Sequence, residues 1–457
     1  MADGESRSSG HVVLASDDGR DRLAGNLGWL DVPVRHADPD GPTRQLAFVR
    51  LPATTDRPGP PIVVLAGGPG ESGVASLVWS EPGRGAWWDE LRRLGDVIAL
   101  DQRGTGWSWP VPEALRGWNL PLDHAVEADE AFARAVSTCR AMRSYWAERD
   151  DVGAYTVVES ADDVARLATA IGSERIRLVG ASYGSHLGMA VIRRHPDRVD
   201  RAVLSLVEGP DQTYKLPSRV DAALRGLAGR AAVAGERGGG HPDLVGLLEA
   251  LLSRLARSPA RLRAGETTVV CGRFDLQRAV ASRLGDQDMM ARLPVDLRRL
   301  EVGDGSWLAE ATVERRRGWP SSAVYYHTDA ASGASPARRE QIASEAADYP
   351  LGDVIDFPFP GIEAAWGDPD IGDALREPVT SDIPVQFLSG GLDGRTPPEN
   401  VLDVRPGFSR SGHIVVDGIA HDEGLASAAV RARLSAFLGG GEPADATLQV
   451  PFRFGAQ

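Results

Sequence analysis

A serine lies in the pentapeptide Gly180–Gly184, directly after the apolar run 175–179. The pattern is G-x-S-x-G between an expected strand and an expected helix. Small residues at such a turn permit the strained backbone that exposes a serine hydroxyl, and the start of the helix offers free N–H groups to a developing negative charge. The pattern therefore predicts that Ser182 is a nucleophile. A serine hydroxyl needs a base to take its proton, so a histidine and a carboxylate should follow.

A carboxylate and a histidine do follow, each just after an expected strand. Asp393 lies in a glycine-rich loop after the apolar run 383–388, and His421 follows the run 413–416. The carboxyl ends of parallel strands meet at one edge of a sheet, where α/β proteins build their sites. Each pattern alone is weak, because 52 glycines make chance G-x-S-x-G matches common. Together, in this order, they predict a triad in which His421 is the base for Ser182 and Asp393 orients the imidazole.

Backbone donors for an oxyanion are expected from the segment Gly67–Gly70, which follows the apolar run 61–66. Glycine allows close approach to a reacting group, and an oxyanion hole needs N–H groups at fixed positions. The candidates are the N–H groups of Gly68 and of Tyr183, the residue after the nucleophile. The overlapping segment Gly68–Gly73 (G-P-G-E-S-G) also matches the dinucleotide pattern G-x-G-x-x-G. That alternative is disfavoured because the next acid at a strand end, Asp101, comes 31 residues after the second glycine, whereas the pattern needs about 20.

The elements that carry these residues indicate an α/β fold with a mostly parallel central sheet and helices on both faces. Residues 210–381 contain no buried strand run, only helical segments and a glycine-rich loop at 235–240. We therefore expect an α/β-hydrolase core in two parts, 1–209 and 382–457, with a helical cap at 210–381 inserted after the strand that follows the nucleophile helix. Ser160 is expected to cap a helix, with two aspartates in its first turn. The expected strands are 45–51, 61–66, 96–101, 175–179, 201–207, 383–388 and 413–416, and the expected helices include 160–170, 219–234, 242–257, 274–284, 336–346 and 423–438.

Composition and charge exclude several classes of partner. The 457-residue chain has 50 Lys and Arg against 64 Asp and Glu, for a net charge of −14, and no long basic tract that would bind nucleic acid. It has no apolar stretch of about 18 residues that could span a membrane and no signal-peptide core near residues 1–10, so a cytoplasmic location is expected. Cys139 and Cys271 have neither metal-site nor disulfide-framework spacing and are expected to be free, buried thiols.

Four segments together resemble the prolyl iminopeptidase and tripeptidyl aminopeptidase group of α/β-hydrolase serine peptidases. Residues 66–70 (A-G-G-P-G) are similar to the group's H-G-G-P-G, and residues 101–108 (D-Q-R-G-T-G-W-S) fit D-Q-R-G-x-G-x-S. The serine pentapeptide fits the group's elbow, and the Asp393 loop is similar to G-x-x-D-x-x-T-P-P. The matches extend from about residue 60 to about residue 425, so the resemblance covers most of the expected core.

One residue differs from the group's pattern, and several others are expected to have structural roles. Ala66 replaces the group's usual histidine, which is thought to support the oxyanion loop. Asp101 and Arg103 of the D-Q-R-G segment are expected to form a structural turn that holds neighbouring loops. His186, one turn after the nucleophile, and His413, at the start of a strand, are expected to be structural. The tryptophans at positions 79, 87, 88, 107 and 109 either line the mouth of the site or, more commonly for aromatic residues, pack in the core.

The resemblance also implies a substrate class. Aminopeptidases of this group hold the free amine of a peptide with carboxylates near the cap, because a buried ammonium needs an opposite charge. Glu208 and Asp329 are the candidates; the alternatives are a turn cap for Glu208 and a solvated loop acid for Asp329. The implied activity is hydrolysis of short peptides through an acyl-enzyme, without metal or organic cofactor. It should fall below about pH 6–7, because the base must be a neutral imidazole. An esterase, lactonase or amidase acting on a small molecule, and a binding protein without turnover, remain alternatives.

Overall fold

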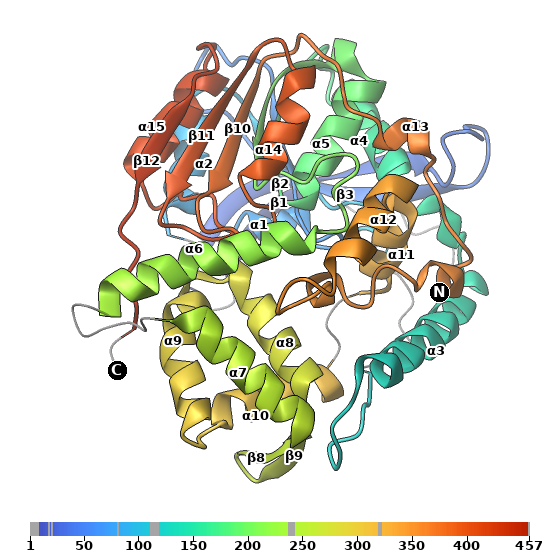
Figure 1. Ribbon diagram of the computed structural model, residues 1–457. Coiled ribbons are helices and arrows are strands. Elements are labelled where there is room, and N and C mark those ends of the chain that lie inside the picture. Colours follow the sequence, from blue (N-terminus) through green and yellow to red (C-terminus); the bar gives the residue numbers. More distant parts are fainter. Residues whose placement is uncertain are drawn as a thin grey trace.

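The computed structural model describes residues 9–16, 19, 22–79, 82–109, 118–235, 243–318 and 322–455. Within these residues the centre of the fold is a ten-stranded sheet in the order β1-β2-β3-β5-β4-β6-β7-β10-β11-β12 (Figure 1). Its strands are β1 (Gly10–Ala15), β2 (Arg22–Pro33), β3 (Thr43–Leu51), β4 (Ile62–Leu65), β5 (Val97–Leu100), β6 (Ile176–Ala181), β7 (Val199–Ser205), β10 (Val385–Gly390), β11 (Ser411–Asp417) and β12 (Ala446–Gln449). Most of the loop expected at 235–240 lies outside the described residues.

The part of the sheet from β5 to β12 is parallel, as the sequence predicts. β4 pairs with β5 and β6, and the pairs β6–β7, β7–β10, β10–β11 and β11–β12 are also parallel. The pairs β1–β2, β2–β3 and β3–β5 are antiparallel. Every residue of β4 and β5 is buried, because these strands are covered on both faces, and such strands are continuous apolar runs.

Helices cover both faces of the sheet. Side chains of β4 alternate between them: Val63 and Leu65 pack with α4 and α5, whereas Ile62 and Val64 pack with α2 and α15. The helices are α1 (Gly73–Ser76), α2 (Arg84–Leu91), α3 (Ala128–Ala147), α4 (Val157–Ala170), α5 (Tyr183–Arg194), α6 (Pro217–Gly235), α7 (Leu244–Arg257), α8 (Arg273–Ala281), α9 (Gln287–Glu301), α10 (Ser306–Arg317), α11 (Ala323–Ser332), α12 (Pro336–Glu345), α13 (Asp373–Arg376), α14 (Glu399–Val404) and α15 (Ala428–Leu438). The α/β-hydrolase architecture expected from the sequence is confirmed.

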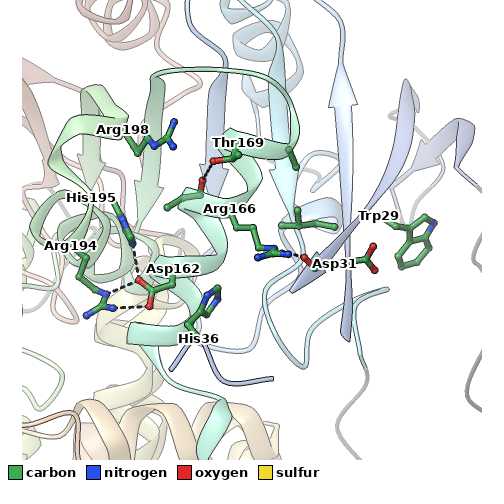
Figure 2. A pocket seen from close by; sticks show the side chains of 12 residues that line it. Trp29, Asp31, His36, Asp162, Arg166, Thr169, Arg194, His195 and Arg198 are labelled. Carbon is green, nitrogen blue, oxygen red and sulfur yellow. Dashed lines mark hydrogen bonds and ion pairs between the residues drawn. The ribbon is translucent and has the colours of Figure 1, made fainter. Parts of the chain in front are cut away.

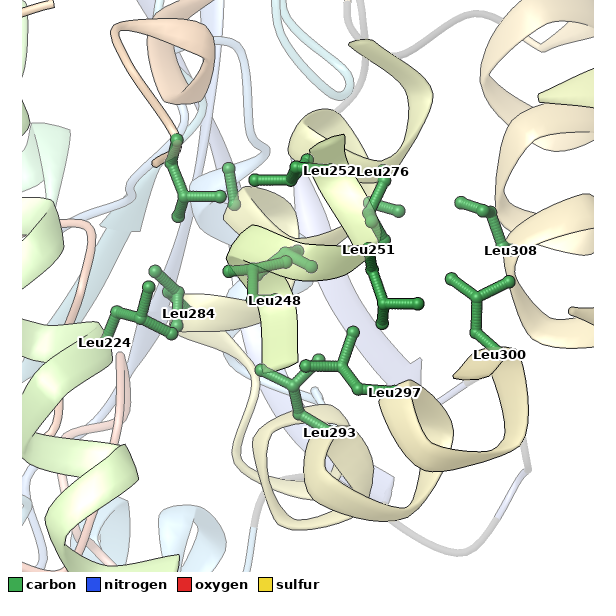
Figure 3. Close-up of a cluster of buried hydrophobic side chains, with 14 of the residues drawn as sticks. Leu224, Leu248, Leu251, Leu252, Leu276, Leu284, Leu293, Leu297, Leu300 and Leu308 are labelled. Carbon is green, nitrogen blue, oxygen red and sulfur yellow. The ribbon is translucent and has the colours of Figure 1, made fainter. Parts of the chain in front are cut away.

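The segment between β7 and β10 carries α6 to α13 and an antiparallel hairpin of β8 (Ala260–Ala264) and β9 (Thr267–Cys271). In Figure 1 the helices α6 to α10 lie beyond one edge of the large sheet. They have a core of their own that is rich in leucine, drawn in Figure 3. Helix α3, which precedes this segment in the chain, packs against α11 and the short helix η5 (Glu363–Trp366). The division at 209/210 and 381/382 stays a prediction.

Two local expectations about helix α4 are wrong. Thr156, not Ser160, caps it by accepting a hydrogen bond from the backbone N–H of Glu159. The helix therefore begins earlier, and Asp162 and Asp163 lie beyond its first turn, where they pair with side chains from other segments. The two cysteines are free and buried, as predicted. No helix in the described ranges is both long and apolar enough to cross a membrane. The cytoplasmic location stays a prediction.

Candidate active site

Ser182 occupies a sharp turn between β6 and α5. Its backbone has φ of +56° and ψ of −126°, which residues other than glycine rarely adopt. A Cβ on Gly180 would clash with the carbonyl of Gly184, and a Cβ on Gly184 would clash with the carbonyl of Leu65 in the neighbouring strand. The Ser182 N–H donates to the carbonyl of Ser205 at 3.0 Å. Strand, strained turn and helix therefore follow one another as the pentapeptide pattern predicts.

Asp393 and His421, in the loops after β10 and β11, are in direct contact. Nδ1 of His421 lies 2.8 Å from Oδ2 of Asp393. The backbone N–H groups of Arg395 and Thr396 donate to Oδ1 at 2.8 and 2.9 Å, and the Thr396 hydroxyl donates to Oδ2 at 2.8 Å. This set of donors holds the carboxylate against the imidazole. With Nδ1 donating to the carboxylate, Nε2 is left as the proton acceptor that a general base requires.

The Asp393 carboxylate is fully buried, whereas the His421 side chain is 17% exposed. Burial alone would raise the pKa of Asp393, but the adjacent His421 and the hydrogen bonds from Thr396 outweigh it and hold the pKa below the ordinary value of 3.8. Asp393 is therefore ionised at neutral pH, and its partner imidazole remains accessible. This is the electrostatic arrangement that stabilises an imidazolium formed during catalysis.

Ser182 lies at the same edge of the sheet as this pair. The strands β6, β7, β10 and β11 are consecutive neighbours and parallel, so their carboxyl ends meet there. Among the residues that the structure describes, no hydrogen bond joins the Ser182 hydroxyl to His421. Two of the three predicted triad side chains are thus in contact, and the third is placed at their edge. Catalytic hydrogen bonds are often long without substrate, so the complete triad stays a prediction.

The predicted oxyanion loop lies against the elbow. Gly68 and Gly70 have φ of +103° and +95°, which glycine adopts without steric cost. A Cβ on Gly67 would lie 3.5 Å from the Cβ of Ser182, so the loop passes directly beside the nucleophile. Within the described part of the chain, the N–H groups of Gly68 and Tyr183 have no acceptor. Both groups are therefore available for an external oxygen.

The D-Q-R-G segment forms hydrogen bonds that support the predicted oxyanion loop. Nε2 of Gln102 lies 3.3 Å from the carbonyl oxygen of Ala66, the residue that replaces the usual histidine. Asp101 accepts hydrogen bonds from the Ser72 hydroxyl at 2.6 Å and from the Val74 N–H at 2.9 Å. The loop is thus held by a side-chain amide and a buried carboxylate. The structural role expected for this segment agrees with these contacts.

Arg103 of the same segment connects three further parts of the chain. Its guanidinium donates to both carboxylate oxygens of Asp163, at 2.5 and 2.9 Å. It also donates to the carbonyl oxygens of Pro33, Val34 and Ala154. The Arg103 side chain is only 6% exposed. A buried charge with this many partners organises loops and does not act on a substrate.

Glu208 and Asp329, the candidate amine-binding residues, lie in a buried charged group with Lys215 and Asp356. We call these four residues the acid–lysine cluster. Nζ of Lys215 lies 3.3 Å from Oε2 of Glu208 and 4.0 Å from Oδ1 of Asp356. Glu208 is 4% exposed and Asp329 is 5% exposed. Oε1 of Glu208 and Oδ1 of Asp329 are buried, and neither has a hydrogen-bond partner among the described residues. Because buried polar atoms almost always have partners, these two oxygens indicate a missing donor.

Protonation of the acid–lysine cluster depends on burial and on mutual repulsion. Burial raises the pKa of Asp329 well above 3.8, and repulsion from Glu208 raises it further. Burial raises the pKa of Asp356 to about 7, although Lys215 opposes this. Burial would lower the pKa of Lys215, but Glu208 and Asp356 outweigh it, so the ammonium stays charged. The cluster can therefore accept a second cation by releasing a proton from Asp329 or Asp356.

Sequence reasoning missed several residues of the site. Lys215 and Asp356 have no local signal, because only the fold brings them to Glu208. Thr396 belongs to the T-P-P segment quoted for the family, which could have identified it. Glu71 directly follows G-G-P-G, and its Oε2 lies 3.2 Å from the position of a Cβ on Gly67. Although Glu71 is exposed to solvent, desolvation by the surrounding protein raises its pKa, and the nearby imidazole opposes this.

His186 and His413 have contacts that fit the structural roles expected for them. Nδ1 of His186 lies 3.2 Å from the carbonyl oxygen of Gly209, and burial lowers the pKa of this histidine. Nε2 of His413 lies 2.9 Å from the Ser389 hydroxyl, and burial lowers its pKa to about 4. Of the tryptophans considered in the sequence, Trp87 and Trp88 are fully buried, whereas Trp79 and Trp107 are exposed.

A large open hollow lies elsewhere, on the surface formed by α4, the end of α5 and β2. Its volume is about 810 Å³, and its lining contains none of the triad residues. Figure 2 shows Asp162 in this hollow, with Arg194 and His195 bonded to it. Burial would raise the pKa of Asp162, but His195 and Arg194 outweigh it and lower the pKa to about 2. Asp162 is thus paired with two basic neighbours, and the hollow contains no member of the predicted triad.

Comparison with known proteins places these features in a family. The profile described as the alpha/beta hydrolase fold matches residues 60–421. Serine protease Hip1 of Mycobacterium tuberculosis is 29% identical over 201 residues, which cover 40% of this chain and 36% of that protein. Tripeptidyl aminopeptidase of Streptomyces lividans is 26% identical over 193 residues, covering 40% of this chain and 36% of that protein. Each of these alignments therefore spans only about a third of the curated relative.

Among solved structures, a proline iminopeptidase of Mycobacterium smegmatis covers 90% of this chain and 97% of its own, at 19% identity and a TM-score of 0.41. The names of the curated relatives agree with the resemblance to the prolyl iminopeptidase and tripeptidyl aminopeptidase group that the sequence motifs indicate. The residues that match the family profile include strands β4 to β7 and the turn at Ser182. They also include β10 and β11, which precede the loops of Asp393 and His421. The chain belongs to the α/β-hydrolase family of enzymes.

Proposed function

We propose that this hydrolase is a serine aminopeptidase that acts on short peptides through an acyl-enzyme. In the first step the Ser182 hydroxyl oxygen attacks the scissile carbonyl carbon while Nε2 of His421 takes the hydroxyl proton. The N–H groups of Gly68 and Tyr183 hold the oxyanion. His421 then gives the proton to the leaving amine, the C–N bond breaks, and water repeats the sequence to release the acid. Asp393 keeps the imidazole in the required tautomer throughout.

The observation that carries the peptidase proposal is the pair of unpartnered oxygens in the acid–lysine cluster. Oε1 of Glu208 and Oδ1 of Asp329 are buried and accept no hydrogen bond from any described residue. A substrate ammonium offers three donors and a charge opposite to both groups. Binding it would satisfy both oxygens and compensate the repulsion between the two carboxylates.

The position of Glu208 supports the same proposal. Its backbone N–H donates to the hydroxyl of Ser185 at 2.9 Å, and that hydroxyl donates to the carbonyl of Ser182 at 2.6 Å. Tyr183, beside the nucleophile, lies within electrostatic range of both Glu208 and Asp329. A peptide whose amine binds these carboxylates would therefore present its first residues to the nucleophile. The relatives named as a tripeptidyl aminopeptidase and a serine protease give loose support to this substrate class.

The test compares alanine peptides that carry a free amino terminus with the same peptides after N-acetylation. We expect acetylation to lower kcat/KM at least tenfold, because hydrogen bonds to charged groups contribute about 1.5–3 kcal/mol. Glu208→Gln and Asp329→Asn should reduce this preference, whereas Glu442→Gln, at an exposed ion pair with Arg410, should leave it unchanged. A fluorophosphonate should label the protein but not the Ser182→Ala variant. Equal rates on free and acetylated peptides would refute amine recognition.

One observation favours a second candidate, an esterase, lactonase or amidase acting on a small neutral molecule. Lys215 already supplies a cation to Glu208 at 3.3 Å, so the cluster does not depend on a substrate charge for all of its compensation. An activity of this kind would use the same nucleophile and oxyanion donors. Short-chain esters hydrolysed much faster than any free-amine peptide, with no effect of Asp329→Asn, would favour this candidate.

A further inference from the structure

Helix α11 carries Asp329, one of the proposed amine-binding residues, together with Tyr325. The two residues are four positions apart, and side chains at this spacing are neighbours on one face of a helix. Burial raises the pKa of Asp329 and repulsion from Glu208 adds to this, whereas a hydrogen bond from the Tyr325 side chain opposes it. A hydrogen bond that lowers the pKa of an acid is one donated to its ionised form. Tyr325 is therefore a donor to the Asp329 carboxylate.

The ring of Tyr325 is held in place by aromatic neighbours. Its centre lies 5.1 Å from that of Tyr326 in an edge-to-face arrangement and 6.3 Å from that of Phe359. Aromatic pairs at these separations favour defined orientations of their rings. Tyr325 is nevertheless only half-buried, whereas Asp329 is buried. The phenol of Tyr325 is thus both fixed by packing and partly accessible.

The first turn of α11 packs against the predicted oxyanion loop. A Cβ on Gly70 would lie 2.6 Å from the Ser322 hydroxyl oxygen and 3.7 Å from the Cβ of Tyr325, so only glycine allows this approach. Ser322 caps the helix by accepting a hydrogen bond from the Tyr325 N–H at 3.2 Å. Gly70 is two residues after Gly68, one of the proposed oxyanion donors. The helix therefore contacts the oxyanion loop at its start and carries an amine-binding acid one turn later.

Tyr325 lies between the amine site and the catalytic loops. It is within electrostatic range of Asp329 and Asp356 in the acid–lysine cluster, and of Arg395, which is two residues after Asp393. These charged residues come from segments that are far apart in the sequence, so the fold brings them to Tyr325. A peptide with its amine at Asp329 and its scissile carbonyl at the oxyanion loop would therefore pass beside this phenol.

We propose that Tyr325 is a positioning residue for the substrate amine. Its hydroxyl orients the Asp329 carboxylate and leaves Oδ1, which has no partner among the described residues, to the ammonium. The packing of its helix on Gly70 keeps this carboxylate at a fixed distance from the oxyanion donors. The inference rests on the amine recognition proposed above and names the residue that aligns the amine with the scissile carbonyl. Removing the hydroxyl alone should weaken amine binding and leave the bond-breaking steps unchanged.

The first measurement is the kinetics of Tyr325→Phe on free and N-acetylated alanine peptides. We expect KM for the free peptides to rise about tenfold with kcat nearly unchanged, because a hydrogen bond to a charged group is lost. KM for the acetylated peptides should stay the same, since they have no ammonium. Tyr326→Phe, which removes the neighbouring hydroxyl in the same helix, is the matched control and should alter neither. An equal effect of Tyr325→Phe on both classes of peptide would overturn the inference, because a general disturbance of the fold acts on every substrate.

A double-mutant cycle tests whether Tyr325 acts through Asp329. In Asp329→Asn, the further change Tyr325→Phe should lower kcat/KM for free peptides less than about twofold, because the carboxylate that Tyr325 orients is absent. In Tyr325→Phe alone, KM should reach its low value at a higher pH than in the parent, since the lost hydrogen bond favours the ionised acid. The other charged groups within range of Asp329 are the same in both proteins, namely Glu208, Lys215 and Asp356. Fully additive losses with an unchanged pH profile would overturn the inference.

A binding measurement separates this inference from the peptidase proposal. Calorimetric binding of the same peptides to Ser182→Ala, with and without Tyr325→Phe, needs no turnover. A preference for free peptides in hydrolysis that Tyr325→Phe leaves unchanged would overturn the role of Tyr325 and leave the peptidase proposal intact. No hydrolysis, but amine-selective binding that Tyr325→Phe weakens, would support the role of Tyr325 and refute the peptidase. Absence of amine selectivity in both hydrolysis and binding would overturn both.

Discussion

Replacing Asp356 with asparagine should change how the stability of the protein depends on pH. Asp356 is buried beside Lys215, and its Oδ2 accepts a hydrogen bond from the Lys215 backbone N–H. Asparagine has nearly the same shape and can accept the same bond, so the substitution removes the titration with little change in packing. The perturbation therefore isolates one ionisable group of the acid–lysine cluster.

The magnitude follows from the pKa of Asp356, which burial raises from 3.8 to about 7. The folded state binds a proton that the unfolded state loses between these two values. The contribution of Asp356 to the free energy of unfolding is therefore greatest below pH 4, and it declines as the pH rises to about 7. The change in pKa corresponds to about 4 kcal/mol, and more than half of it falls between pH 5 and pH 7. The asparagine variant lacks this decline.

The assay is urea unfolding of both proteins at several pH values between 4.5 and 8.5. The difference in unfolding free energy between Asp356→Asn and the parent protein should shift by several kcal/mol in favour of the variant as the pH rises through this range. Asp382→Asn, at an exposed position, is the matched control and should show no such shift. Parallel pH profiles for Asp356→Asn and the parent would refute the argument, because they would mean that Asp356 titrates alike in the folded and unfolded states.

Three further predictions concern the site and its supports. Asp393→Asn should lower kcat for peptide hydrolysis by about 10⁴-fold through the wrong histidine tautomer, with a melting temperature close to that of the parent, and a loss below tenfold would contradict the triad. Gly184→Ala should destabilise the protein by about 1–3 kcal/mol in urea unfolding, because its Cβ meets the carbonyl of Leu65, and unchanged stability would argue against the tight elbow. Arg103→Met should cost about 3–5 kcal/mol by the same measurement, since it leaves Asp163 buried with less compensation; a cost under 1 kcal/mol would show that the pair is dispensable.

The catalytic core could be predicted from the sequence because its signals are local and lie in fully buried strands. β4 and β5 are continuous apolar runs since both faces of the sheet are covered there. The loops that follow such strands then define one edge, and the chain order of Ser182, Asp393 and His421 restricts their roles. Of the three predicted triad side chains, only those of Asp393 and His421 are in direct contact in the structure.

Other elements escaped prediction for physical reasons. Strand β2 (Arg22–Pro33), which lies between β1 and β3, mixes exposed and buried residues and carries no continuous apolar run. Helix α9 (Gln287–Glu301) contains Pro294, a residue that usually interrupts a helix, and α10 (Ser306–Arg317) ends in three consecutive arginines, so neither has a clear helical signal in the sequence. The start of α4 was predictable: Thr156-Val157-Val158-Glu159 matches the capping-box pattern S/T-x-x-E, which takes precedence over Ser160.

The charged groups of the site could not be predicted because their pairing depends on tertiary structure alone. Lys215 reaches Glu208 only because the chain turns back after β7, and Asp356 joins them from a segment about 140 residues later. No spacing in the sequence distinguishes these residues from solvated surface charges. Substrate recognition is thus the part of this enzyme that sequence patterns reveal least.

The side chain of Ser185 contacts both the predicted nucleophile and a proposed substrate-binding residue. The Ser185 hydroxyl donates to the carbonyl of Ser182 and accepts from the N–H of Glu208, so both residues are held by a single group in the first turn of α5. The nucleophile and the proposed amine-binding carboxylate are therefore fixed relative to each other within the core. Asp329, the other proposed amine-binding carboxylate, comes from the segment between β7 and β10. Changes in that segment can alter the charges that a substrate must carry while the strained turn and the Asp393–His421 pair remain in place.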